Sequence, residues 1–290
     1  MSQNMRELLS NMPSWSREQY KELAAAGRFL SILPLPDSTR LFGAEQVVPQ
    51  LIMGSSYFPF IGLLLGLILW IVGLIFRLFV PAIALAAILV VALVILTGGL
   101  HLDGMMDSFD GLLGGTSPEH KLEIMRDSRV GSFGVLAGVC VLLLKFALLA
   151  SLAVTLFQTS SLQATALMTV VFLIVLPAVR WGVVLAVRLF PSARTTGLGA
   201  SFRQTVTLQR LGIAGGTSFL IALIVGLAVG SWLAGLAALL VWVGATIAAL
   251  LAGGWIARNL GGLTGDSYGA IIEISEVAAL LLVVLLRSWL

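Results

Sequence analysis

The sequence predicts an all-α membrane protein, a polytopic transmembrane bundle of six to seven helices. Hydrophobic residues make up 59% of the 290 residues and charged residues only 11%, and the mean hydropathy is +1.04. Soluble globular domains carry about a quarter charged residues, so the composition excludes a soluble enzyme and a disordered chain. The one cysteine, Cys140, lies inside an apolar run, which leaves no disulfide framework and no cysteine-based zinc site.

Seven apolar segments account for the predicted spans, because a helix needs roughly 20 apolar residues to cross a bilayer. Six of them are long enough. The seventh has only the residues after Glu276, so we expect it to be tilted, incomplete or interfacial. The predicted segments are 57–76, 78–96, 131–157, 162–187, 211–230, 232–257 and 277–290. We treat residues 1–290 as a single integral membrane domain.

The charges gather in four segments that alternating spans place on one side of the membrane. These are the N-terminal arm 1–56, the loop 97–130, the loop 188–210 and the Gly- and acid-rich segment 258–276. They hold all 14 acidic residues and most of the 17 basic ones. The positive-inside rule puts this side in the cytoplasm. The basic residues therefore indicate membrane topology rather than nucleic-acid binding.

The arm contains a stretch of mixed apolar and charged residues, Trp15–Leu33, before Pro34 and Pro36. This spacing is typical of an interfacial helix, although an ordinary soluble arm stays open.

The loop 97–130 carries the strongest functional signal. Asp103, Asp107 and Asp110 are spaced i, i+4 and i+7, so they share one face of a helix. Glycines after Asp110 end that helix, and Thr116 or Ser117 can cap a second one, with Pro118 in its first turn and Glu119 three residues after Thr116. We predict that the second helix carries Arg126 and Asp127 and ends at Arg129. The result is an acidic helical hairpin on the cytoplasmic face.

Three stacked carboxylates next to a membrane repel one another unless cations join them. Magnesium prefers oxygen ligands and is commonly held by carboxylates together with substrate phosphates, and arginines bind phosphate in a bidentate manner. The loop therefore predicts a metal-assisted diphosphate site formed by Asp103, Asp107, Asp110 and Asp127 with Arg126 and Arg129. The alternative is that the aspartates only cap and solvate a surface loop.

The second acidic segment, 258–276, has four glycines around Asp266, followed by Glu273 and Glu276. It lies on the same predicted side as the hairpin, so the two clusters can meet. A glycine turn with acids favourable to a helix N-terminus is the alternative.

Four further residues are weaker candidates. Arg180, inside a predicted span, can point toward the carboxylates or a phosphate, or snorkel to the interface. Lys145 lies deeper, where a buried ion pair and a catalytic role are equally open. Arg194 sits in a flexible loop suited to a phosphate. His101 can act as a base, bind phosphate or pack at the end of a span.

Three sequence stretches resemble one known family. TGGLHLDGMMDSFDGLLGG (97–115), LEIMRDSRVGSFGVL (122–136) and GGLTGDSYGAIIEISE (261–276) are similar to the adenosylcobinamide-GDP ribazoletransferase family, also called cobalamin synthase or cobalamin-5'-phosphate synthase. FLSILPLP (29–36), RW (180–181) and ARTTGLGASF (193–202) agree more weakly. The departures, at Met105–Met106, Arg126 and Thr195–Thr196, remove no carboxylate.

The resemblance implies a magnesium-dependent transferase of the cell inner membrane. Such an enzyme joins adenosylcobinamide-GDP to α-ribazole, or to α-ribazole 5'-phosphate. It forms adenosylcobalamin or its 5'-phosphate and releases GMP, in the last stage of nucleotide loop assembly in vitamin B12 biosynthesis. The implied partners are these small molecules and the lipid bilayer, with no nucleic acid, and a homo-oligomer is left open.

With that reaction, the candidate residues take provisional roles. We expect the metal ligands to be Asp103, Asp107, Asp110, Asp127 and Asp266. We expect Arg126, Arg129 and Arg194 to bind phosphates, with Arg180 and His101 as further candidates.

Three other classes of protein stay open at this stage. CDP-alcohol phosphotransferases begin their motif with Asp-Gly-x-x-Ala-Arg, whereas Asp103-Gly104 is followed here by Met-Met-Asp-Ser. Prenyltransferases with aspartate-rich sites are expected to have two such motifs, and the second cluster has one aspartate. A cation- or proton-coupled secondary transporter places its acids at mid-membrane in duplicated halves. Here the acids are predicted in loops at one face, without duplication.

Overall fold

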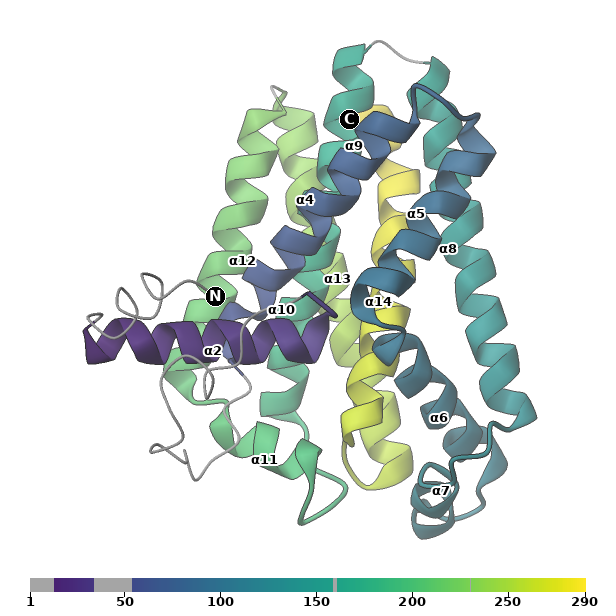
Figure 1. The fold of residues 1–290 in the computed structure, drawn as a ribbon, viewed down its shortest axis with the longest axis vertical. Helices are drawn as coiled ribbons and strands as arrows, with labels where there is room; N and C mark the ends of the chain where they lie inside the picture. The colour runs from purple at the N-terminus through teal and green to yellow at the C-terminus, as the bar shows by residue number, and fades with distance from the viewer. Residues whose placement is uncertain (1–12, 34–53, 159–160, 230) are drawn as a thin grey trace, which may run out of the picture.

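The computed structural model describes residues 13–33, 54–158, 161–229 and 231–290, and these form an all-α protein, as predicted (Figure 1). Most of the predicted arm, including Pro34 and Pro36, lies outside the described residues. The helices are α2 (Ser14–Leu30), η1 (Ser55–Tyr57), α4 (Phe58–Phe76), α5 (Ala82–Thr97), α6 (Leu100–Gly114), α7 (Pro118–Ile124), α8 (Ser132–Gln158), α9 (Ser161–Leu173), α10 (Val175–Leu189), α11 (Leu198–Thr205), α12 (Leu208–Ala228), α13 (Trp232–Leu260), α14 (Gly265–Leu286) and η2 (Arg287–Trp289).

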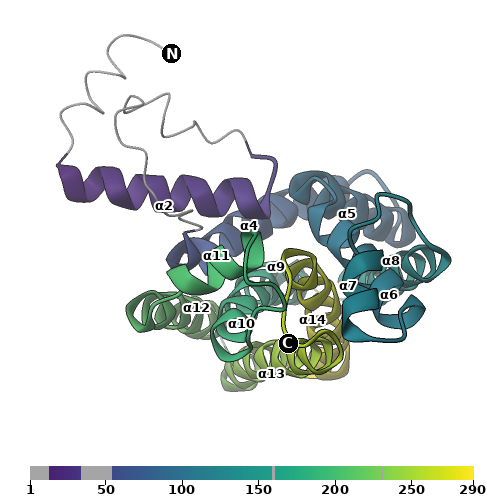
Figure 2. The same ribbon diagram turned by 90° about the horizontal axis from the view of Figure 1, so that it is seen from below.

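The number of spans agrees with the prediction of six to seven, but the predicted span 78–96 is not one of the six, because α5 reaches the length of a span only together with α6. Six segments are long and apolar enough to cross a membrane, and the bent pair α5 and α6 makes a seventh if it counts as one span. The segment Ala164–Leu189, formed by α9 and α10, is the most buried of the six and occupies the centre of the bundle (Figure 2). Outward-facing side chains of the other spans are large and apolar, as expected for contact with lipid.

The last span differs from the prediction. It begins at Gly265 and extends to Trp289, so the expected start at residue 277 is wrong. Thr264 caps this helix in a reciprocal capping box with Ser267. Glu273 and Glu276 therefore belong to a spanning helix rather than to a loop, and only 261–264 of the second segment connects α13 to α14.

A sharp break separates α5 from α6. Gly98 and Gly99 both have left-handed backbone conformations, with φ of +64° and +72°, which only glycine adopts without strain. The chain bends there by 87°, and α6 then packs against α14 and α8.

The short helix α7 follows α6 and packs against it. The Ser117 hydroxyl accepts a hydrogen bond from the His120 backbone N–H at 3.2 Å, so of the two predicted caps Ser117 is the one used. The predicted end at Arg129 is wrong, since α7 ends at Ile124. Arg126 and Asp127 consequently lie in the connection to α8. That this acidic pair of helices faces the cytoplasm stays a prediction.

Helix α2 lies across the bundle rather than along it (Figures 1 and 2). Its C-terminal half packs on α4 and η1 and buries Ala24, Ala26, Gly27 and Leu30. Trp15 at its other end is exposed. Figure 1 shows α7, α11 and the turn between α13 and α14 at one end of the bundle, so the loops expected to share a side do share one.

Candidate active site

A cavity of about 350 Å³ lies where the predicted clusters meet. Its wall includes two carboxylates, Asp103 of α6 and Asp266 of α14, and two arginines, Arg194 and Arg28. His101 also lines it. The cavity thus combines acidic and basic side chains from segments distant in sequence, and the two acidic clusters do come together.

Two glycines bring α6 and α14 into contact. A Cβ atom placed on Gly104 would lie 2.6 Å from the carbonyl oxygen of Asp266. Conversely, a Cβ on Gly269 would lie 2.7 Å from the carbonyl oxygen of His101. Because neither glycine has a side chain, the two backbones approach closely, and Asp103 and Asp266 are presented to the same cavity.

The loop that carries Arg194 is attached to the start of α14 by backbone pairing. The Ala193 N–H donates to the Leu263 carbonyl at 2.9 Å, and the Leu263 N–H donates to the Pro191 carbonyl at 2.8 Å. Arg194 Nη2 in turn donates to the Leu122 carbonyl at 3.2 Å. These bonds hold the guanidinium between α7 and α14, near Asp266.

Asp103 and Asp107 are the carboxylates of α6 that remain available. Asp103 is exposed and Asp107 is half-buried, and neither makes a hydrogen bond or ion pair within the described part of the chain. Asp107 lies close enough to Asp103, Asp266 and Asp110 to be repelled by them. Among the described residues, no three His, Cys, Asp or Glu side chains are already arranged to hold a metal ion.

Asp110 was predicted to bind metal together with Asp103 and Asp107, but its carboxylate is taken up by backbone hydrogen bonds. It is buried, and its Oδ1 and Oδ2 accept hydrogen bonds from the backbone N–H groups of Gly134 at 2.7 Å and Gly131 at 2.8 Å. The carboxylate therefore caps the N-terminus of α8, where a negative charge is favourable.

Asp127 is exposed and paired with Arg129, from which it accepts a hydrogen bond at 2.6 Å. Hydrogen bonds from the Arg129 side chain and backbone lower the pKa of Asp127 to about 2. Arg126 is also exposed. Asp127, Arg126 and Arg129 do not line the cavity.

This difference between the two aspartates predicts different effects on stability. Asp110→Asn leaves one of the two backbone N–H groups at the start of α8 without an acceptor. We therefore expect a loss of about 1–3 kcal/mol in unfolding free energy. Asp127→Asn removes only an exposed pair and should leave the melting temperature nearly unchanged. Thermal unfolding of both variants in the same detergent checks this. Equal melting temperatures would contradict the capping of α8 by Asp110.

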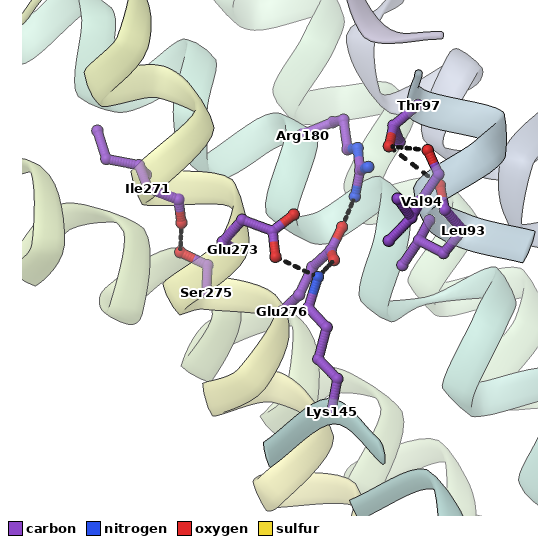
Figure 3. A network of polar contacts seen from close by, with 9 residues as sticks. All are labelled: Leu93, Val94, Thr97, Lys145, Arg180, Ile271, Glu273, Ser275 and Glu276. Carbon is purple, nitrogen blue, oxygen red and sulfur yellow. Dashed lines mark hydrogen bonds and ion pairs between the residues drawn. The ribbon is translucent and has the colours of Figure 1, made fainter. Parts of the chain in front are cut away.

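Further along α14 from the cavity lies a buried group of four charges, shown in Figure 3. Glu276 of α14 bonds both Lys145 of α8 and Arg180 of α10, and Lys145 also pairs with Glu273 at 2.7 Å. Of the two roles left open for Lys145, the structure shows the ion pair. Arg180 is fully buried and is not part of the cavity wall.

Sequence reasoning missed Arg28, which reaches the cavity from α2. The neighbouring Phe29 anchors this end of α2, with ring centroids 5.5 Å from Phe58 and 5.7 Å from Phe202. Tyr268, whose ring is 5.4 Å from Phe202, continues these contacts to the cavity wall. No local motif marks Arg28, because its place depends on how α2 docks on the bundle.

A polytopic bundle with carboxylates and arginines around a cavity at one end is the arrangement expected of a membrane enzyme that acts on a phosphorylated substrate. The family model described as cobalamin-5-phosphate synthase matches residues 22–284. The chain belongs to this family.

Curated relatives agree with that membership. The adenosylcobinamide-GDP ribazoletransferase of Desulfitobacterium hafniense (strain Y51) is 40% identical over 261 residues, covering 90% of this chain and 95% of that protein. The protein of the same name from Roseiflexus sp. (strain RS-1) is 42% identical over 266 residues, covering 90% and 88%. The one from Deinococcus radiodurans is 36% identical over 270 residues, covering 92% and 87%. No solved structure matches the chain.

Proposed function

We propose that the cavity between α6, α14 and the Arg194 loop is the site of ribazole transfer. Family membership makes the chain an adenosylcobinamide-GDP ribazoletransferase, which acts in assembly of the cobalamin nucleotide loop. The observation that carries the site assignment is that Asp103 and Asp266 share one cavity with Arg194 and Arg28. This mixture of charges suits a diphosphate donor and its counter-ions.

In the proposed reaction, a hydroxyl of α-ribazole, or of its 5'-phosphate, attacks the phosphorus on the cobinamide side of the diphosphate. A new bond forms between the hydroxyl oxygen and this phosphorus, the bond from the phosphorus to the bridging oxygen breaks so that GMP leaves with that oxygen, and the hydroxyl proton passes to the solvent. Arg194 and Arg28 bind the diphosphate oxygens, since guanidinium groups match phosphate geometry. Arg194 is fixed by its bond to Leu122, so it positions the diphosphate with little loss of side-chain freedom.

Magnesium is part of this proposal, and the residues present suit it. Asp103 and Asp107 have no other partner in the described chain, and Asp266 is nearby. Magnesium is usually held by one or two carboxylates together with substrate phosphates, so a preformed cluster of three ligands is not needed. When bound, the ion neutralises charge on the phosphates. Of the predicted ligands, Asp110 and Asp127 are occupied by other contacts, so we propose Asp103, Asp107 and Asp266.

His101 is the proposed polar contact at the floor of the cavity. Its side chain is buried, and both ring nitrogens make no hydrogen bond with the described residues. A polar group of the substrate would satisfy one of them. Arg126 and Arg129, which lie outside the cavity wall, are left as contacts for the approaching substrate only.

The test is GMP release by purified protein in detergent, given adenosylcobinamide-GDP, α-ribazole and Mg²⁺. We expect corrinoid product and GMP in equal amounts, loss of both after EDTA, and recovery when Mg²⁺ is added back. Folded wild-type protein that releases no GMP from this donor would contradict the proposed function. Product formation unaffected by EDTA would contradict the magnesium assignment alone.

A further inference from the structure

A groove of about 640 Å³ lies on the outer surface of the spanning helix α13, beside the end of α10. Figure 2 shows α13 at the outer edge of the bundle. Among the described residues, Arg258 is the one charged member of the groove wall, and the other members are apolar. No described residue lines both this groove and the active-site cavity, so the two are separate sites.

Glycines on α13 form the hollow. The Phe190 ring lies against Gly253 and Gly254, where an added Cβ would come within 3.1 Å and 3.3 Å of it. Because these two positions carry no side chain, the surface of α13 is indented there. Trp255, which also lines the groove, contacts Phe109 of α6 with ring centroids 5.9 Å apart. Packing between helices therefore fixes the groove walls.

The groove faces the bilayer. A stripe of apolar side chains, each 40–69% exposed, runs along α13 and ends at the groove: Leu236, Leu240, Val243, Ile247, Leu251 and Trp255. Successive members are three to four residues apart, so they share one helix face, and an exposed apolar face of a spanning helix meets acyl chains. Arg258 follows in the last turn of the span, at the depth where tryptophan and basic side chains meet lipid headgroups.

Arg258 is a cation without a counter-ion. It is exposed and makes no hydrogen bond or ion pair within the described part of the chain. No acidic side chain of that part lines the groove. A guanidinium group matches phosphate in charge and in hydrogen-bond geometry. An apolar groove with a free arginine at headgroup depth therefore fits a ligand that has both a phosphate and an acyl chain.

A second copy of this chain fits the groove less well. In a symmetric dimer the same surface patch meets itself. Two Arg258 side chains would then enter the interface, and the described groove walls supply no acid to either of them. Removing unpaired charges from water is costly, so the charge of the groove favours an anionic lipid.

We propose that this groove binds one anionic phospholipid, whose phosphate contacts Arg258 and whose acyl chain lies along Leu251 on the apolar stripe. The site is separate from the active-site cavity, and binding there is measured without catalytic turnover. It therefore does not depend on the proposed function.

The test is native mass spectrometry of delipidated protein in detergent, titrated with phosphatidylglycerol or with phosphatidylcholine of the same acyl chains. One basic side chain near a membrane surface contributes about fivefold to the binding of anionic lipid. We expect the first phosphatidylglycerol to bind at least about fivefold more tightly than phosphatidylcholine. Arg258→Gln should abolish this preference, and Arg258→Lys should keep most of it.

Arg287→Gln is the matched control for the charge. Arg287 is also an exposed arginine at the end of a spanning segment, near Trp289, but it does not line the groove. Its loss should leave the preference for phosphatidylglycerol unchanged.

Leu251→Trp tests the acyl-chain part of the site, because it places a larger side chain in the groove. Binding of both lipids should weaken by at least about threefold as the chain loses its contacts with the wall. Ile247→Trp, one turn earlier on the same stripe and outside the groove wall, is the control and should bind both lipids as the wild type does.

Four results would overturn the proposal. They are equal affinity of the wild type for the two lipids, equal effects of Arg258→Gln and Arg287→Gln, equal effects of Leu251→Trp and Ile247→Trp, and a dimer that Leu251→Trp dissociates, which would assign the groove to a second copy. The substituted residues are exposed, so melting temperatures should stay close to that of the wild type. If Arg258→Gln does not fold, Arg258→Lys and Leu251→Trp decide the outcome.

Discussion

Asp103→Asn is expected to reduce Mg²⁺-dependent GMP release by at least about 100-fold, the usual order for removal of one charge-stabilising group from an active site. Asp103 lines the cavity, is exposed to it, and has no partner within the described chain. Its carboxylate therefore makes no contact that stabilises the fold, and its negative charge is available to a metal ion or substrate. The measurement is the initial rate of GMP release over a range of Mg²⁺ concentrations.

The same substitution should not destabilise the protein. Asp103 and Asp107 are one helical turn apart, and a like-charge pair at this spacing costs a few tenths of a kcal/mol. Removing one charge relieves that repulsion. The melting temperature should therefore equal or slightly exceed that of the wild type, although the activity is lost. A fall in activity caused by unfolding would show the opposite pattern.

Glu123→Gln is the matched control for the loss of one carboxylate in this region. Glu123 is an exposed residue of α7 outside the cavity wall. We expect activity within about twofold of wild type, as for surface substitutions in general. Full activity in Asp103→Asn would remove this carboxylate from the site, and an equal loss in Glu123→Gln would indicate a general charge effect.

Hydropathy predicted most of the spans because their outer faces meet lipid and must be apolar whatever their neighbours are. It failed at α14, where Asp266, Glu273 and Glu276 interrupt the apolar run. Two of these acids are compensated by Lys145 and Arg180, which lie on other helices about 100 or more positions away in sequence. No local pattern reveals that compensation, so the sequence alone favoured a loop.

Helical spacing placed Asp103, Asp107 and Asp110 on one face, and all three do lie on α6. Spacing within one helix says nothing about what faces it. The N-terminus of α8 meets Asp110 through the amides of Gly131 and Gly134, whereas α14 and the cavity meet Asp103. The sequence could therefore propose these three aspartates together as metal ligands. Only the tertiary structure shows that Asp110 holds the start of α8 whereas Asp103 faces the cavity.

The close approach of α6 to α14 leads to the second large effect, expected for Gly104→Ala. The added Cβ would lie 2.6 Å from the carbonyl oxygen of Asp266 and 3.2 Å from its Cα, and both are backbone atoms that no rotamer change can move. The two helices must separate, at a cost of about 1–3 kcal/mol for overpacking. This separation moves Asp266 away from Asp103, so we expect kcat to fall by about 10²-fold.

Gly216→Ala is the control that isolates this contact. Gly216 lies in α12, and apart from its own helix backbone and its chain neighbours no described atom lies within 4 Å of an added Cβ, so alanine should fit without strain. Alanine at such a helical position is favoured by up to about 1 kcal/mol over glycine. We therefore expect an equal or higher melting temperature and unchanged kcat in Gly216→Ala. Wild-type kcat in Gly104→Ala would show that transfer tolerates a displaced α14, and Asp266 would then have to leave the proposed metal site.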